Sequence, residues 1–181
     1  MSSKTVNGVL FIIAGLAPLL IYLGLGPDGT GILDVNLTEK LAIWFTLSTP
    51  IALMMTVDAM KGGSGHGYAK AGFVIVVIGW AGGIVSDAFN SAEMTANADA
   101  IAPAVWSSMA LGLVVTGIGY YIQKFFPIWL SGLMLVVSIF AFIVLGFVEE
   151  TPSTEILLYP LWLGFSLTLV LLGTFTIRRK N

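Results

Sequence analysis

Six long windows that are almost free of charged residues constrain this chain more than any other feature of its sequence. A helix of roughly 20 apolar residues crosses a bilayer core about 30 Å thick, because each residue advances the helix by about 1.5 Å. The windows run approximately over residues 7–26, 41–60, 69–90, 100–122, 125–148 and 156–177. Each is about twice as long as a barrel strand and lacks polar alternation, so helices are predicted. We therefore predict an all-α integral membrane protein whose single transmembrane domain, residues 1–181, is a bundle of six transmembrane helices.

The overall composition agrees with this prediction and narrows the chemistry. Hydrophobic residues make up 57% of the chain and charged residues 10%, whereas soluble domains carry about 25% charged residues. The chain has no cysteine. This excludes a disulfide scaffold, a thiolate metal site and cysteine catalysis.

The charged residues divide unequally between the two sides of the predicted bundle. One side holds seven of the eight basic residues: Lys4, Lys61, Lys70, Lys124, Arg178, Arg179 and Lys180. The same side holds one acid, Asp58, so its formal charge is +6. The other side holds nine acids and Lys40, so its formal charge is −8. Because cytoplasmic loops retain Lys and Arg, we expect both termini in the cytoplasm and the protein in the cytoplasmic membrane of a prokaryote.

The segments that enter the second, fourth and sixth helices resemble one another. Each has an acid, a short apolar stretch and then a tryptophan, at Trp44, Trp106 and Trp162. This pattern suggests three tandem helical hairpins inserted with the same orientation. Independent anchoring of each helix by a tryptophan at the headgroup level is the alternative explanation.

Residues that could carry catalysis are scarce. His66 is the only histidine and lies in a glycine-rich stretch, residues 61–68, that we interpret as a flexible connector. The deep parts of the predicted helices hold no ionisable residue, which argues against proton-coupled transport through a buried carboxylate. Asp58 lies three residues before Lys61, a spacing that allows an ion pair, and Asp87 lies near the end of its helix. We expect no enzyme activity and no cofactor.

The basic tail and the acidic loops have simple explanations as well. The tail, residues 178–180, follows a membrane helix directly, so anionic lipid explains it better than nucleic acid does. The acids at 28, 34 and 149–150 carry oxygen ligands that suit a divalent cation, although we favour a solvated face. Asn36 begins a glycosylation triplet, and triplets of this kind often arise by chance.

Two prolines mark the first two helices as candidate sites of bending. Pro18 and Pro50 each remove one helical hydrogen bond, and Ser48 and Thr49 precede the second proline. Kinked helices of this kind can line a substrate cavity. We therefore take Pro18, Ser48, Thr49, Pro50 and Thr116 as the candidate hinge or cavity residues.

Small residues four positions apart predict where two helices pack closely. Gly79 and Gly83 form one such ridge, and Ser108 and Gly112 form another. Ridges of this type allow close backbone approach where lipid gives no hydrophobic driving force.

These observations favour a non-catalytic membrane protein over a transporter. The first hypothesis is an accessory or structural subunit that packs against other membrane proteins or copies of itself within the lipid bilayer. The alternative is a small-solute channel, a carrier or the substrate-binding membrane component of a transporter. A polar cavity reaching Ser48, Thr49 and Thr116 at mid-membrane would favour transport, and a dry, close-packed interior would favour a subunit.

Overall fold

The computed structural model describes residues 2–27, 29–148, 151 and 154–179, and these residues form helices joined by short loops. Their helical elements are α1 (Ser3–Pro18), η1 (Leu19–Leu25), α2 (Val35–Thr46), α3 (Ser48–Ala59), α4 (His66–Ser91), α5 (Thr95–Gln123), α6 (Ile128–Phe147), η2 (Glu155–Leu157) and α7 (Leu158–Arg178). They provide six stretches long and apolar enough to cross a membrane, with α1 and η1 forming the first and α2 and α3 the second. The prediction of six apolar helices is confirmed.

Local sequence signals explain several of the helix ends. The Ser2 side chain accepts a hydrogen bond from the backbone N–H of Thr5 and caps α1, and the Asp34 side chain caps α2 by accepting from the N–H of Leu37. Lys124 ends α5 in the left-handed conformation, at φ +50°, and Pro127 directly precedes α6. These ends follow from ordinary capping chemistry, because the first N–H groups of a helix have no partner within it.

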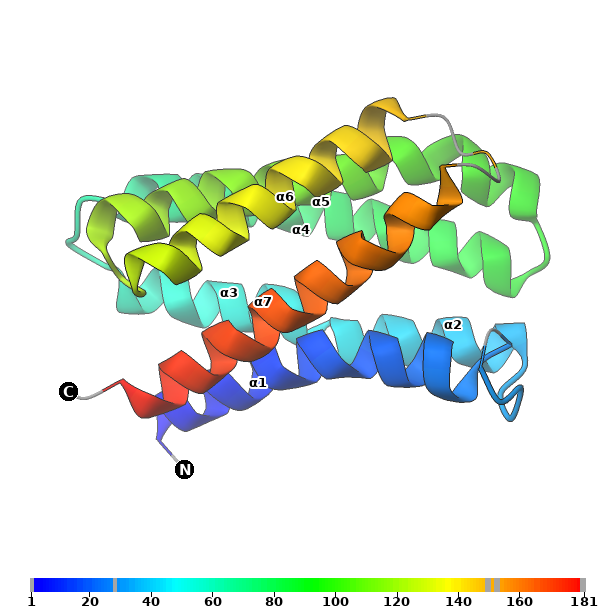
Figure 1. Cartoon of the computed structure of the whole chain (residues 1–181), viewed down its shortest axis with the longest axis horizontal. Helices are drawn as coiled ribbons and strands as arrows, with labels where there is room; N and C mark the ends of the chain where they lie inside the picture. The colour runs from blue at the N-terminus through cyan, green and yellow to red at the C-terminus, as the bar shows by residue number, and fades with distance from the viewer. Residues whose placement is uncertain (1, 28, 149–150, 152–153, 180–181) are drawn as a thin grey trace.

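The six spans form a ring in chain order (Figure 1). The first span contacts the second, the second contacts α4, and α4, α5, α6 and α7 then follow one another. The ring closes because α7 crosses back obliquely and packs along α1. Both termini lie at one end of the bundle together with the α3–α4 and α5–α6 loops, and we call this the terminus end.

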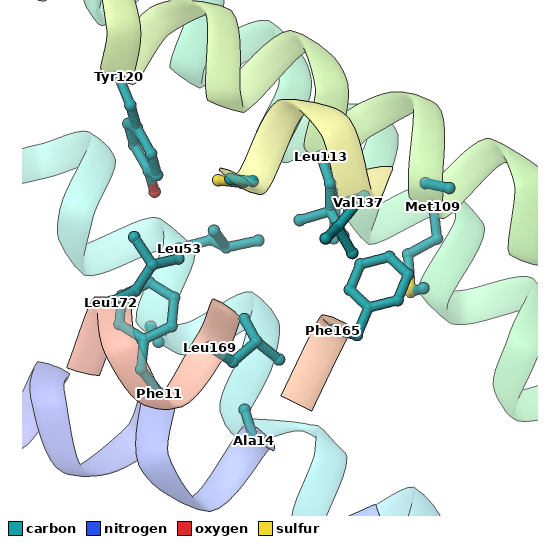
Figure 2. Packing of buried hydrophobic residues seen from close by; sticks show 14 of the residues in the cluster. Phe11, Ala14, Leu53, Met109, Leu113, Tyr120, Val137, Phe165, Leu169 and Leu172 are labelled. Carbon is teal, nitrogen blue, oxygen red and sulfur yellow. The ribbon is translucent and has the colours of Figure 1, made fainter. Parts of the chain in front are cut away.

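Large apolar side chains occupy the space inside this ring (Figure 2). Phe11, Leu53 and Leu172, contributed by three different spans, are fully buried and lie close together. Further along the ring axis, Leu113 and Phe165 continue the same cluster. Burial of these side chains makes the interior a packed core, as in other folded proteins.

The three sequential hairpins differ in their packing. The helices α4 and α5 make the most extensive contact in the bundle, whereas α6 and α7 contact each other much less. The three tryptophans also differ, because Trp106 packs edge-on against Trp80 at 5.9 Å while Trp44 is 62% exposed. A tandem repeat thus stays a hypothesis, and these contacts give it no added support.

Glycines allow α4 and α5 to pack closely along a line of contact that we call the α4–α5 seam. A Cβ atom added to Gly72 would lie 2.4 Å from the backbone nitrogen of Thr116, and one added to Gly79 would lie 2.5 Å from that of Met109. On the facing helix, Gly112 and Gly119 approach α4 equally closely. The glycines on each helix are seven residues apart, and seven residues bring a helix back to nearly the same face. The two backbones therefore touch almost directly.

The predicted ridge residues belong to this seam with one exception. Gly79 and Gly112 face the opposite backbone, and a Cβ atom at Gly83 would meet the ring of Trp106. The hydroxyl of Ser108 instead donates to the carbonyl of Ala104 in its own helix at 2.7 Å.

A second glycine seam, between α1 and α7, was missed from the sequence. A Cβ atom at Gly173 would lie 2.4 Å from the carbonyl oxygen of Gly8, and one at Gly15 would lie 2.6 Å from that of Ser166. Here too, the facing small residues are seven apart on each helix. This seam closes the ring between the first and last spans.

Candidate functional site

The candidate hinge residues of the second span lie where its helix is locally irregular, around Leu47, which keeps helical φ and ψ angles. Helix α2 ends at Thr46 and α3 begins at Ser48, so Ser48, Thr49 and Pro50 form the first turn of α3. The hydroxyl of Ser48 donates to the carbonyl of Phe45 at 2.6 Å, and that of Thr46 donates to the carbonyl of Ala42 at 2.5 Å. Both hydroxyls bond carbonyls of α2, and neither bonds the carbonyl of Thr46, which is the one that Pro50 leaves without an i−4 donor.

Pro18 changes the first span in another way. It is the last residue of α1, and the chain continues directly into the π-helical turns of η1. π-helical turns are rare in proteins, and those that do occur are often found at functional sites. The first span is therefore irregular over its final third, without a loop.

Thr116 lies apart from the irregular stretch of the second span. It is completely buried, its hydroxyl donates to the carbonyl of Gly112 at 2.9 Å, and it packs against Gly72 in the α4–α5 seam. The structure therefore brings Ser48, Thr49 and Pro50 together and places Thr116 between two other helices.

Two shallow pockets open at the ends of the bundle, and none of the five candidate cavity residues lines either one.

A buried carboxylate that precedes the predicted apolar window lies inside the second span. Helix α2 begins at Val35, six residues before the predicted window, so Glu39 is helical and only 8% exposed. The hydroxyl of Tyr22 in η1 donates to its Oε2 atom at 2.6 Å. The apolar window predicted from residue 41 excluded Glu39, and the structure places this residue within α2.

Asp87 of α4 completes this group, which we call the Glu39 cluster: Tyr22, Glu39 and Asp87. Asp87 is partly buried and lies near enough for its charge to act on both other members. The cluster lies toward the end of the bundle opposite the terminus end, where the irregular η1 meets α2. Hydropathy alone could not reveal it, because Glu39 falls between an acidic loop and the apolar window.

A second polar group lies near the terminus end, and we call it the Asn7 cluster: Asn7, Thr56 and Tyr120. The amide nitrogen of Asn7 donates to the hydroxyl of Thr56 at 3.0 Å, and that hydroxyl donates to the carbonyl of Ala52 at 2.9 Å. Tyr120 is fully buried with its hydroxyl beside Thr56, although no hydrogen bond of good geometry joins them. The Oδ1 atom of Asn7 also lacks a partner among the described residues.

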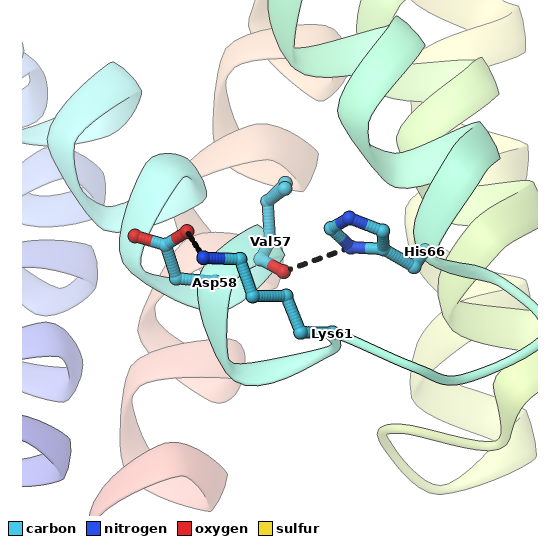
Figure 3. A network of polar contacts seen from close by, with 4 residues as sticks. All are labelled: Val57, Asp58, Lys61 and His66. Atoms are coloured by element: carbon cyan, nitrogen blue, oxygen red, sulfur yellow. Dashed lines mark hydrogen bonds and ion pairs between the residues drawn. The ribbon is translucent and has the colours of Figure 1, made fainter.

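The loop between α3 and α4 is tied down by polar contacts (Figure 3). Asp58 and Lys61 form the predicted ion pair at 3.6 Å on the surface. The Nδ1 atom of His66 lies 3.1 Å from the carbonyl oxygen of Val57, and His66 starts helix α4. The side chain of Gln123 adds a link to this loop, accepting from the N–H of Gly65 and donating to the carbonyl of Met60. His66 therefore belongs to a helix start and not to a flexible connector.

The acidic loop residues offer no metal centre within the described chain. Residues 28, 149 and 150 lie outside the described residues, and Asp34 uses its carboxylate to cap α2. Across residues 2–27, 29–148, 151 and 154–179, no three His, Asp or Glu side chains are grouped to hold a metal ion. Asn36, the first residue of the glycosylation triplet, donates to the carbonyl of Ser91 at 3.0 Å.

Comparison with models of known protein families, with curated proteins and with solved structures found no match to this chain. The proposal below therefore depends on the geometry of the bundle.

Proposed function

We propose that this chain is a non-catalytic, polytopic membrane protein that acts as an accessory or structural subunit. Its function on this proposal is to pack against other membrane proteins, or against copies of itself, within the bilayer. The observation that supports this most is the core, because Phe11, Leu53 and Leu172 occupy the space inside the ring of spans. A solute would have to displace these side chains to pass through the bundle.

The outer surface supports the same proposal. Large apolar side chains are exposed on every span, with Leu20, Trp44, Ile78, Val136 and Leu167 among the most exposed. Soluble monomers rarely expose apolar patches larger than a few hundred Å², whereas lipid and membrane partners cover such surfaces. A surface of this kind accepts the bilayer and neighbouring helices equally well.

We propose that the terminus end faces the cytoplasm of a prokaryotic cell. The described cations at this end include Lys4, Lys61, Lys124, Arg178 and Arg179, and cytoplasmic loops are enriched in such residues. The chain has no native cysteine, so Ser64→Cys in the α3–α4 loop would supply a single thiol. We expect a membrane-impermeant maleimide to label it in inside-out vesicles and not in intact spheroplasts; the reverse pattern would overturn this orientation.

Intact assemblies test the subunit proposal. The full chain, extracted with native lipid and measured by native mass spectrometry, should appear in a complex of fixed stoichiometry that is heavier than the 19.2 kDa chain. The partner should be a second membrane protein or further copies of this chain. A chain that is monomeric at every concentration tested, and that moves a solute after reconstitution, would refute the proposal.

The transporter alternative is supported by one specific observation, the Glu39 cluster. An ionisable residue buried in a membrane helix is unusual, and this one lies where two irregular spans meet. Interrupted helices form the substrate sites of many carriers. If the chain is a carrier, Glu39→Gln should abolish solute uptake by reconstituted vesicles, and Pro50→Ala should reduce it. An absence of uptake for every class of solute tested would rule this alternative out.

A further inference from the structure

The carboxylate of Glu39 is buried within the second span, and one of its two oxygens has no hydrogen-bond partner. The residue is 8% exposed, and the hydroxyl of Tyr22 donates to Oε2 at 2.6 Å. No described residue donates to Oε1. This atom differs from the unpartnered oxygens of Asn7, Tyr120 and Ser131, which are essentially inaccessible, because it keeps a little accessible surface. Oε1 is therefore open to a small ligand.

No cation among the described residues neutralises Glu39. The pair formed by Asp58 and Lys61 is the only ion pair between described residues. Lys40 follows Glu39 directly in the sequence, but its side chain is exposed and forms no ion pair with Glu39. A carboxylate left without a counter-charge in a membrane span is costly.

Asp87 of α4 places a second acid beside the first. It is partly buried, and it lies near enough to Glu39 for the two charges to interact. Two neighbouring carboxylates cannot both stay ionised at low cost, because each disfavours the charge of the other and burial disfavours both charges. The pair therefore favours the binding of a positive ligand.

The surrounding elements supply no buried group of opposite charge within the described chain. Helix α2 packs against α1, η1, α3 and α4, and α4 packs in turn against α5. Apart from the Glu39 cluster, the acids nearest to this end on α2, α5 and the α4–α5 turn are exposed: Asp34, Glu93 and Asp99. The other ionisable residues of the packed elements lie toward the terminus end (Figure 1): Lys4, Asp58, His66, Tyr68, Lys70, Tyr120 and Tyr121.

The geometry favours a proton over a metal ion as the positive ligand. Mg²⁺ and Ca²⁺ take about six or more oxygen ligands, and no three His, Asp or Glu side chains of the described chain are grouped to hold a metal ion. The hydroxyl of Tyr22 already occupies Oε2 of Glu39. A proton needs only one oxygen lone pair and no cavity.

We propose that Glu39 and Asp87 bind one proton between them at neutral pH. The proton neutralises one of the two carboxylates, and the hydroxyl of Tyr22 stabilises the charge that remains. Asp87 is the less buried acid of the two, so the proton exchanges with water through it, at the end opposite the terminus end. The inference goes beyond the subunit proposal, and it holds whether the chain acts as a subunit or as a carrier.

Infrared spectroscopy of the full-length protein in lipid vesicles tests this proton directly, because a protonated carboxyl has a C=O stretch well separated from that of a carboxylate. Exposed acids are ionised at pH 7. The wild-type protein should therefore show the band of one protonated carboxyl at pH 7, shifted in D₂O and lost at alkaline pH. Exchange of sodium chloride for choline chloride should leave the band unchanged. Absence of the band at pH 7, or its growth when sodium is removed, would overturn the proposal.

Three variants assign the band to the pair. Glu39→Gln and Asp87→Asn should each remove it, because the remaining carboxylate has lost its charged neighbour. Glu93→Gln is the matched control, since Glu93 is an exposed acid near the same end, and it should keep the band. Circular dichroism verifies that the variants remain folded, and the wild-type spectra stand if one does not.

A band that survives either substitution in the pair, or that Glu93→Gln removes, would overturn the pair as the site. Neither outcome affects the subunit proposal, because native mass spectrometry measures assembly independently of this proton.

Discussion

The α4–α5 hairpin and the first two spans are similarly apolar, but their backbones differ. In the hairpin, glycines such as Gly72 and Gly112 bring two uninterrupted helices into direct backbone contact. In the first two spans, the helix becomes π-helical after Pro18 and is locally irregular before Pro50, and Glu39 is buried between them. The comparison teaches that one bundle can combine a rigid seam with an irregular, polar pair of spans, and that hydropathy alone does not tell them apart.

Substitution of a seam glycine should give the largest effect. We expect Gly72→Ala to destabilise the protein by about 3 kcal/mol, because the added methyl group would clash with the backbone of Thr116 and Gly112. The measurement is the free energy of unfolding in mixed micelles, followed by tryptophan fluorescence.

Gly132→Ala in α6 is the matched control. A Cβ atom there meets nothing within 4 Å, and alanine favours a helix over glycine by up to about 1 kcal/mol. Its stability should be unchanged or higher. If both variants lost stability equally, the seam would not be the rigid part of the bundle.

Removal of the hydroxyl that contacts Glu39 should give an intermediate effect. We expect Tyr22→Phe to cost about 2 kcal/mol, since a hydrogen bond to a buried carboxylate is lost while the carboxylate remains. In a Glu39→Gln background the same change should cost less, because a neutral amide tolerates burial better. A double-mutant cycle of unfolding free energies measures this coupling, and zero coupling would contradict the contact.

Replacement of the proline in the irregular stretch of the second span should give the smallest effect. We expect Pro50→Ala to change stability by less than about 1 kcal/mol, because Pro50 lies in the first turn of α3, where proline is tolerated since the first N–H groups of a helix have no partner within it. The same unfolding experiment measures it. A gain of several kcal/mol would show that this stretch stores strain, and the irregular spans would then be poised to move.

Six helices and their alternation could be predicted from the sequence, since a span must be long and apolar whatever it packs against. Gly79 and Gly112 could be assigned to a close contact for a similar reason, because small residues have few other uses on a membrane helix. The packing of α7 against α1 could not be predicted. Gly8 and Gly15 are seven residues apart and so mark one face of α1 as a site of close contact, but this spacing does not indicate which helix lies against that face. The burial of Glu39 could not be predicted, because the start of α2 is set by the Asp34 cap and not by hydropathy.

The central claim is that the interior of the ring is closed to solutes, and solvent access at the irregular stretch of the second span tests it most directly. Ser48→Cys would place a single thiol at a buried position that a substrate cavity would have to expose. We predict no labelling by a membrane-impermeant maleimide from either side of sealed vesicles, and complete labelling after unfolding in detergent, while Ser64→Cys is labelled in the folded protein. Labelling of the folded Ser48→Cys protein from either side would contradict the closed interior and favour a carrier.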